Sequence, residues 1–326
     1  MSSRGSALAA ASAAIIAACT LAITAPTAEA DASRLPGTID IPCATTTLRQ
    51  NADWYLPTGT PKGMVWVQHG FARTNNNVAQ LATAFADSGY LVFAPALPFM
   101  DLAGCTLQNL GDNTGFLDNV ATLFGTATDP DGALARSLTA AAAHAGQVAP
   151  PLPSNFVFVG HSAGAEAVAF VAHRLHVAHP EVFSRLRGLV LLDPVKSFLG
   201  DNSDRALADL DPTALPILTI AAAPSLCNNL GSGTTAVQHQ LHRPFLGISV
   251  SDGMHTDAEG TSSDSLGTLL CGTPSIANTT MLRTLALGWT GDFLTGTQTA
   301  DYYPTTEAAV TPTVPAAPTA TILRGQ

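Results

Sequence analysis

The chain has 326 residues, a net charge of −10 at neutral pH and only 14 lysines and arginines. An acidic chain without a basic cluster is not typical of nucleic-acid-binding proteins, and an anionic membrane surface would repel it. Its length accommodates one large α/β domain or two small ones.

The first thirty residues have the pattern of a secretory signal peptide. Arg4 lies in a short polar start, residues 7–23 are mainly Ala, Ile and Leu, and A-E-A at residues 28–30 forms an A-x-A cleavage signal. We predict cleavage after Ala30 and release of the protein from the cell. Alternatively, I-A-A-C at residues 16–19 resembles a lipobox, and Cys19 would then be lipidated. No other segment has the length and apolarity of a membrane span.

Removal of the first thirty residues leaves four cysteines: Cys43, Cys105, Cys227 and Cys271. An even number in an exported chain predicts two disulfides. Four cysteines allow three pairings, and the sequence does not choose between them; we favour Cys43–Cys105 and Cys227–Cys271. None of the spacings is C-x-x-C, so a zinc or redox site is not expected.

Short apolar strands alternate with helical stretches along the rest of the chain. We predict strands at residues 64–67, 90–94, 155–159, 189–192, 217–221 and 245–250, and helices at 78–88, 132–147, 163–178 and 276–293. This alternation predicts an α/β fold with a mostly parallel central sheet and helices on both faces. Residues 31–300 would form the catalytic domain, and the Pro/Thr/Ala-rich residues 301–326 a loosely packed C-terminal tail.

Residues 160–164 read G-H-S-A-G, between the strand at 155–159 and the helix at 163–178. G-x-S-x-G at a strand-to-helix junction is typical of a nucleophile elbow, in which two glycines permit a tight turn and the serine hydroxyl projects above the sheet edge. The alternative is an ordinary turn that contains a serine. The context favours Ser162 as a nucleophile, with the Ala163 amide as one donor of an oxyanion hole.

A serine nucleophile needs a base and an acid that orients the base. Among the nine histidines, His255 lies in the polar loop that follows the strand at 245–250, from which it could reach Ser162. The loop after the strand at 217–221 contains no carboxylate, but Asp193 ends the preceding strand. We therefore predict His255 as the base and Asp193 as the acid. Asp252 and Asp257 flank His255 and remain alternatives for the acid.

The second oxyanion donor is predicted in the loop at residues 68–71, where Gly70 allows a sharp turn and the Phe71 amide would face the site. The Phe71 ring and His161 are predicted to contact the substrate; for Phe71 the alternative is an ordinary core position.

Two further features call for a structural interpretation. Glu166, one turn into the elbow helix, is expected to have a hydrogen-bonded structural role. His173, His176 and His179 could share a helix face as a metal site, but we expect surface residues, and no metal or cofactor is predicted.

These motifs together resemble the α/β-hydrolase superfamily, over about residues 64–293. QHGF at 68–71 and GHSAG at 160–164 are similar to the oxyanion loop and elbow of the branch that holds chlorophyllases and secreted, cutinase-like polyester hydrolases. GLVLLDPV at 188–195 and GMHTDAEG at 253–260 resemble the chlorophyllase segments that carry the acid and the histidine. Polyester hydrolases of this branch carry the acid one strand later, so the pattern is closer to the chlorophyllases.

The sequence therefore predicts a secreted, monomeric serine carboxylic-ester hydrolase that acts on small-molecule or polymeric esters. About two dozen residues separate Asp193 from the strand at 217–221, where many lipases insert a lid, and this predicts an open cleft without a large lid. The alternatives are an acyltransferase with the same triad, a polyester- or cutin-type hydrolase, a peptidase, and a non-catalytic binding protein on a hydrolase scaffold.

Overall fold

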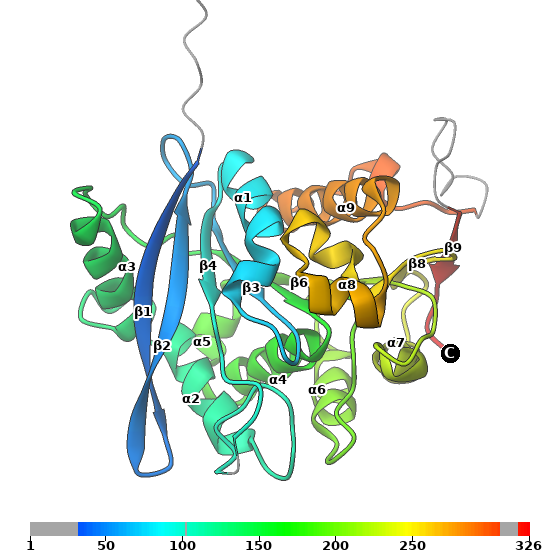
Figure 1. Cartoon of the computed structure of the whole chain (residues 1–326), viewed down its shortest axis with the longest axis horizontal. Coiled ribbons are helices and arrows are strands. Elements are labelled where there is room, and N and C mark those ends of the chain that lie inside the picture. Colours follow the sequence, from blue (N-terminus) through cyan, green and yellow to red (C-terminus); the bar gives the residue numbers. More distant parts are fainter. Residues whose placement is uncertain (1–31, 102, 307–318) are drawn as a thin grey trace, which may run out of the picture. The chain divides into compact units, whose positions relative to one another are not determined.

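A nine-stranded sheet lies at the centre of the structure, a computed structural model that describes residues 32–101, 103–306 and 319–326 (Figure 1). Its strand order is β1-β2-β4-β3-β5-β6-β7-β8-β9. The pairs from β4 to β8 are parallel, whereas β1–β2, β2–β4 and β8–β9 are antiparallel. The strands are β1 (Ser33–Cys43), β2 (Thr46–Leu56), β3 (Met64–Gln68), β4 (Leu91–Pro95), β5 (Phe156–His161), β6 (Leu186–Leu192), β7 (Ile217–Ala221), β8 (Gly247–Val250) and β9 (Ala320–Leu323).

The continuous apolar strands arise because the sheet is buried on both faces. Successive side chains of β3 and β5 point to opposite faces of the sheet. Trp66 and Phe158 therefore enter one core, and the valines on either side of each of them enter the other. The first core is aromatic: the ring centroids of Trp66 and Phe158 are 4.9 Å apart, and Phe124 from the neighbouring helix layer packs against both. β3 and the first four residues of β5 therefore carry an apolar residue at nearly every position.

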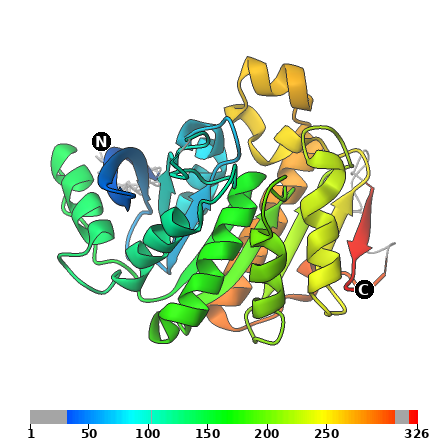
Figure 2. The same ribbon diagram turned by 90° about the horizontal axis from the view of Figure 1, so that it is seen from below.

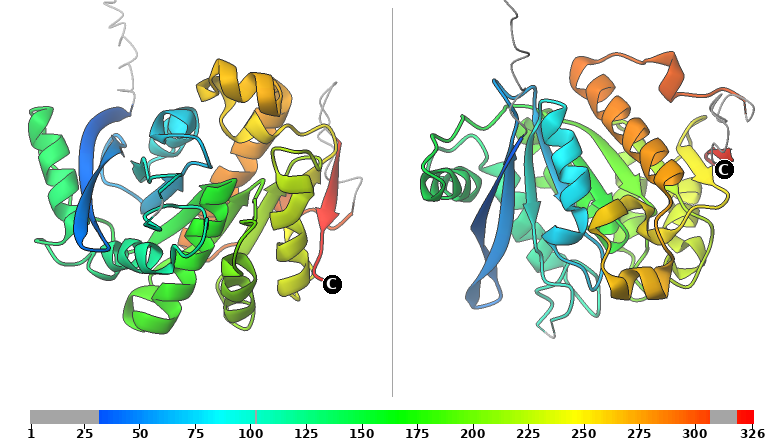
Figure 3. Two further views of the ribbon diagram at one scale, coloured as in Figure 1. Left: turned by 60° about the horizontal axis from the view of Figure 1, so that its bottom comes forward. Right: turned by 45° about the horizontal axis from the view of Figure 1, so that its top comes forward.

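Helices cover both faces of the sheet. Figure 2 shows α4, α6 and α7 side by side across one face, and the right-hand view of Figure 3 shows α1 and α9 across the other. The α-helices are α1 (Ala79–Asp87), α2 (Thr114–Gly125), α3 (Ala133–His144), α4 (Ala163–Ala178), α5 (Pro180–Phe183), α6 (Asn202–Leu210), α7 (Ser232–Gln240), α8 (Ser265–Cys271) and α9 (Ile276–Thr295). The 3-10 helices are η1 (Asn75–Val78), η2 (Asn229–Gly231), η3 (His255–Ala258), η4 (Gly260–Ser262) and η5 (Ala300–Tyr302).

The strand order and the two helix layers are those of the α/β-hydrolase fold, so the predicted fold class is confirmed. The segment between β6 and β7, where a lid was not expected, contains α6, which packs against α4. The predicted signal peptide and lipobox lie outside the described residues. Within those residues, no helix has both the length and the apolar character needed to cross a bilayer.

The β1–β2 hairpin was not predicted, because its sequence hides the usual signals. β1 contains Pro36, Gly37 and Pro42, which are uncommon inside strands, yet its alternate residues Leu35, Ile39 and Ile41 are buried. β2 is polar over its first half, and only its last five residues are fully buried. β1 tolerates its prolines because it is the edge strand, and one side of its backbone needs no partner. The polar half of β2 extends beyond β4, which pairs with β2 only over Ala52–Tyr55.

The end of the chain corrects the expectation of a loosely packed tail. Ala320–Leu323 form β9, which pairs antiparallel with β8, and Ile322 and Leu323 are buried. The Pro- and Thr-rich composition of residues 301–326 concealed this four-residue strand, which is stabilised by pairing with a strand far away in the sequence.

Both favoured disulfide pairings are confirmed. Cys43–Cys105 joins the end of β1 to the loop after β4, and Cys227–Cys271 joins the loop after β7 to the end of α8. The second bridge lies close to the segment that carries His255, because α8 follows η3 and η4 in the chain.

Candidate active site

The turn between β5 and α4 holds Ser162 in a strained backbone conformation. Its φ of 59° and ψ of −128° are rare for a residue with a side chain. A Cβ atom on Gly160 would lie 2.4 Å from the Gly164 carbonyl oxygen, and one on Gly164 would lie 2.4 Å from the His69 carbonyl oxygen. The two glycines are therefore needed because the backbone approaches itself and the loop after β3 too closely for any side chain.

Ser162, His255 and Asp193 form a continuous hydrogen-bonded chain across the carboxyl ends of β5, β6 and β8. His255 Nε2 lies 3.0 Å from Ser162 Oγ, and His255 Nδ1 lies 2.5 Å from Asp193 Oδ2. All three side chains are buried. The imidazole can therefore accept the serine proton at one nitrogen while its other N–H group donates to the carboxylate.

Asp193 is held by donors from the strand beside it. Its Oδ1 accepts a hydrogen bond of 3.0 Å from the Ala222 N–H, and the Asn228 side-chain amide lies 3.2 Å from both carboxylate oxygens. Sequence reasoning missed Asn228, although it lies in the loop after β7 that was noted for having no carboxylate. The Asn228 side-chain amide in that loop holds Asp193, which directly follows β6. An asparagine in this loop was the sequence feature that could have indicated the contact.

The two alternative acids do not contact His255. Asp257 accepts hydrogen bonds from the backbone N–H groups of Met254, at 2.7 Å, and Ser275, at 2.8 Å, so it holds the loop in shape. Asp252 is exposed to solvent. Of the three candidates, only Asp193 is placed beside the imidazole.

His161 lies beneath the loop that carries His255, and this placement corrects the expectation that it contacts substrate. Its Nε2–H group donates a 2.9 Å hydrogen bond to the backbone carbonyl of His255, and the ring is buried. Burial lowers the pKa of His161 well below its usual value, and the neighbouring His255 and Arg73 lower it further. The neutral ring therefore supports the loop that carries His255.

A buried ion pair joins the loop after β3 to the loop after β8, and sequence reasoning did not identify it. Arg73 Nε lies 2.9 Å from Glu259 Oε1, and the same carboxylate oxygen is 4.0 Å from His161 Nδ1. Arg73 also pairs with Asp264 at 3.1 Å. Arg73 comes two residues after Phe71, and Glu259 comes four residues after His255, so the pair connects the predicted oxyanion loop to the histidine loop.

The segments that carry the two predicted oxyanion donors adjoin Ser162. A Cβ atom on Gly70 would be 2.6 Å from Ser162 Cβ, which places the loop after β3 directly against the serine. Phe71, the next residue, is 36% exposed, and its ring packs edge-on against Phe99 with centroids 5.4 Å apart. Ala163 is the first residue of α4, where backbone N–H groups have no partner within the helix.

The two weaker sequence features have structural contacts. Glu166 is buried and accepts hydrogen bonds from the Ser197 N–H at 3.0 Å and the Ser203 hydroxyl at 2.5 Å. His173 and His176 each lie 2.8 Å from the same oxygen of Asp209. Within the described ranges, no group of three His, Cys, Asp or Glu side chains is placed to hold a metal ion.

Two hollows lie at opposite edges of the sheet. The first, which we call the His255 hollow, has a volume of about 480 Å³ and is bounded by Pro224, Leu226, Met254, His255, Leu270 and the Cys227–Cys271 bridge.

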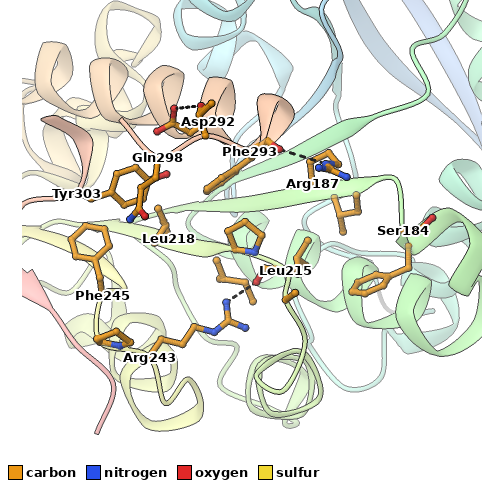
Figure 4. A pocket seen from close by; sticks show the side chains of 18 residues that line it. Ser184, Arg187, Leu215, Leu218, Arg243, Phe245, Asp292, Phe293, Gln298 and Tyr303 are labelled. Carbon is orange, nitrogen blue, oxygen red and sulfur yellow. Dashed lines mark hydrogen bonds between the residues drawn. The ribbon is translucent and has the colours of Figure 1, made fainter. Parts of the chain in front are cut away.

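The second, which we call the amino-edge cavity, has a volume of about 690 Å³ and lies where β6 and β7 begin. Figure 4 shows Arg187, Arg243, Phe245, Phe293 and Tyr303 around it.

Comparisons with known proteins assign no family to the chain. No family model matches the chain, and no curated protein matches it. Among solved structures it is similar to dienelactone hydrolase from Anabaena variabilis ATCC 29413, with 16% sequence identity, a TM-score of 0.48, and alignment over 80% of this chain and 97% of that one. The chain's own strand order and helix layers identify it as an α/β-hydrolase fold.

Proposed function

We propose that the chain is a secreted serine hydrolase that cleaves carboxylic esters through Ser162, His255 and Asp193. The observation that carries this proposal is the position of the His255 imidazole, with one nitrogen 3.0 Å from the serine oxygen and the other 2.5 Å from the carboxylate. Hydrogen bonds at both ends of one imidazole are what general-base activation of a serine requires.

In the first half of the reaction, Ser162 Oγ attacks the ester carbonyl carbon while His255 Nε2 takes the hydroxyl proton. Asp193 stabilises the imidazolium that forms and keeps its Nδ1–H group in place. His255 then gives its proton to the leaving alcohol oxygen, the carbon–oxygen bond of the ester breaks, and an acyl-enzyme remains. Water, deprotonated by the same imidazole, releases the acid and restores the serine.

The negative oxygen of each tetrahedral intermediate would be bound by the backbone N–H groups of Phe71 and Ala163. Support comes from the contact of Gly70 with Ser162 and from the position of Ala163 at the start of α4. Donors fixed in a site that excludes water stabilise a developing charge more strongly than donors in solvent. The Arg73–Glu259 pair would keep the loop that carries Phe71 in position.

Export fits the two disulfides, because such bonds persist in oxidising compartments. The proposed acid, Asp193, directly follows β6, and this supports the resemblance to the chlorophyllase-like pattern. We propose ordinary carboxylic esters as substrates. We also propose that the protein acts as a monomer and needs no metal or cofactor.

The test is hydrolysis of p-nitrophenyl acetate, butyrate and palmitate by the exported protein, with Ser162→Ala alongside. We expect rapid cleavage of the short esters, and labelling of wild type but not of Ser162→Ala by a fluorophosphonate. Labelling without hydrolysis, but with transfer of the acyl group to an added alcohol, would replace the hydrolase by an acyltransferase. Failure of both labelling and hydrolysis would favour a binding protein on this scaffold.

A further inference from the structure

We propose that the His255 hollow binds the alcohol portion of the ester and selects for apolar alkyl or ring alcohols. This proposal rests on the ester-hydrolase function above and deepens it, because it assigns one side of the scissile bond to a specific surface. The hollow has about 480 Å³, within the range of ligand pockets, which is about 300–1,000 Å³.

The hollow borders His255, which forms part of its lining. The leaving alcohol oxygen must come within hydrogen-bond distance of His255 Nε2 to receive its proton. The carbonyl oxygen must instead point towards the loop that carries Gly70 and Phe71, which lies against Ser162. The group attached to the leaving oxygen is therefore the part of the substrate nearest to the hollow.

Apolar side chains line the hollow and remain exposed to solvent. Leu226 is 91% exposed, Leu270 is 66% exposed and Met254 is 43% exposed. Exposed leucines grouped beside a reactive side chain are a common mark of a binding surface, because their contact with water is unfavourable until a ligand covers them.

The hollow is also built to keep its shape. The Cys227–Cys271 bridge links the residues directly next to Leu226 and Leu270, so the two leucines are fixed in neighbouring segments. The Gly272 backbone packs closely against Met254, since a Cβ atom there would lie 2.6 Å from the methionine sulfur.

Charge narrows the class of alcohol further. Among the described residues that line the hollow, Asp252 is the only carboxylate and none is a lysine or arginine. An anionic alcohol, such as a phosphate-bearing one, would be repelled by Asp252 and would find no cationic partner among these residues. A neutral, apolar alcohol is the class that this surface fits.

The experiment compares two isomeric esters, hexyl acetate and ethyl hexanoate, with ethyl acetate as the common reference. The isomers have the same size and nearly the same hydrophobicity, and both leaving groups are primary alcohols of similar acidity. We expect wild type to prefer hexyl acetate in kcat/KM, by about two- to fourfold per methylene that the hollow covers. The double variant Leu226→Ser/Leu270→Ser should lose about tenfold in kcat/KM on hexyl acetate and stay within twofold on ethyl hexanoate.

Ile276→Ser is the matched control, because Ile276 is 88% exposed and does not line the hollow. It should leave both esters unchanged. A preference for ethyl hexanoate, a loss in the double variant on ethyl hexanoate, or no preference at all would overturn the alcohol-side assignment while p-nitrophenyl ester hydrolysis still supports the enzyme. If wild type cleaves no ester, the hydrolase function fails as well.

Discussion

The two edges of the sheet are built differently. At the carboxyl edge, the loops after β5, β6 and β8 bring together Ser162, Asp193 and His255 within a few ångströms. Of the exposed large apolar side chains in the described residues, all but Val148 and Val177 also lie in segments that follow the carboxyl end of a strand. The amino edge has the larger of these two hollows, about 690 Å³ against about 480 Å³, but Ser184 in its lining donates its hydroxyl to the Glu181 backbone carbonyl.

The difference teaches that the larger of the two cavities is not the one beside the hydrogen-bonded Ser162, His255 and Asp193. The polar groups of the amino-edge cavity mostly bind backbone: Arg243 donates to the Leu215 carbonyl at 2.6 Å, and Arg187 Nε donates weakly to the Phe293 carbonyl at 3.5 Å (Figure 4). Such bonds complete the ends of helices and strands. At the carboxyl edge, the polar groups bind one another in a chain that ends at the Ser162 hydroxyl.

The largest expected effect separates the two edges directly. Ser162→Ala should lower kcat/KM on p-nitrophenyl butyrate by about 10⁴-fold or more, because it removes the only atom that forms the acyl-enzyme. Arg187→Gln, in the larger hollow, should change kcat/KM by less than twofold. Initial rates with matched circular dichroism spectra would check both. A large loss in Arg187→Gln with an intact fold would show that the amino edge takes part in the reaction.

Next in size is the effect of the acid. Asp193→Asn should lower kcat by about 10³- to 10⁴-fold, because an amide cannot stabilise the imidazolium or hold the required tautomer. Asp40→Asn makes the same change of charge at an exposed position on β1 and should stay within twofold. Steady-state kinetics on p-nitrophenyl butyrate would measure both. A near-normal Asp193→Asn would move the role of the acid elsewhere.

The sequence was informative where local rules govern structure. G-H-S-A-G predicted its own turn because close backbone approach admits only glycine on either side, and α4 has the predicted bounds of 163–178. Asp193 was predictable as a carboxylate at a strand end.

Long-range pairs escaped prediction. Arg73 and Glu259 are 186 positions apart, and although Glu259 lies within GMHTDAEG, nothing in that stretch indicates an arginine partner. Asn228, β9 and the buried place of His161 likewise depend on segments that meet only after the sheet has formed. A single sequence records which residues are present at such a junction but not which junctions exist.

The carboxyl edge should also be the acid-sensitive edge. Burial lowers the pKa of His69 from 6.5 to about 4, and burial also lowers the pKa of His161. Below pH 6.5 these two histidines therefore bind protons in the unfolded chain that they do not bind in the folded chain, so their contribution to the free energy of unfolding falls as the pH decreases towards 4.

For His69 alone the loss is about 2 kcal/mol at pH 5 and about 3 kcal/mol at pH 4. Urea unfolding at pH 7 and pH 5 would measure it, and His69→Gln should flatten the dependence. If the free energy of unfolding falls equally between pH 7 and pH 5 in wild type and variant, the acid sensitivity does not come from His69. The arginines of the amino-edge cavity stay charged throughout this range and do not contribute to it.

The smallest predicted effect tests whether the loops at the carboxyl edge hold one another in position. Glu259→Gln keeps the shape of the side chain but removes its charge, which leaves buried Arg73 paired only with Asp264, a residue with a half-exposed side chain. We expect kcat/KM to fall by about tenfold and thermal stability to decrease, because breaking a buried ion pair loosens both loops that the pair connects. Asp264→Asn removes the other partner of Arg73 and should change kcat/KM by less than twofold, since exposed pairs contribute little. Equal losses in the two variants would mean that Arg73 positions the loops through the surface, and that the buried carboxylate beneath His161 has no special part in holding the catalytic histidine.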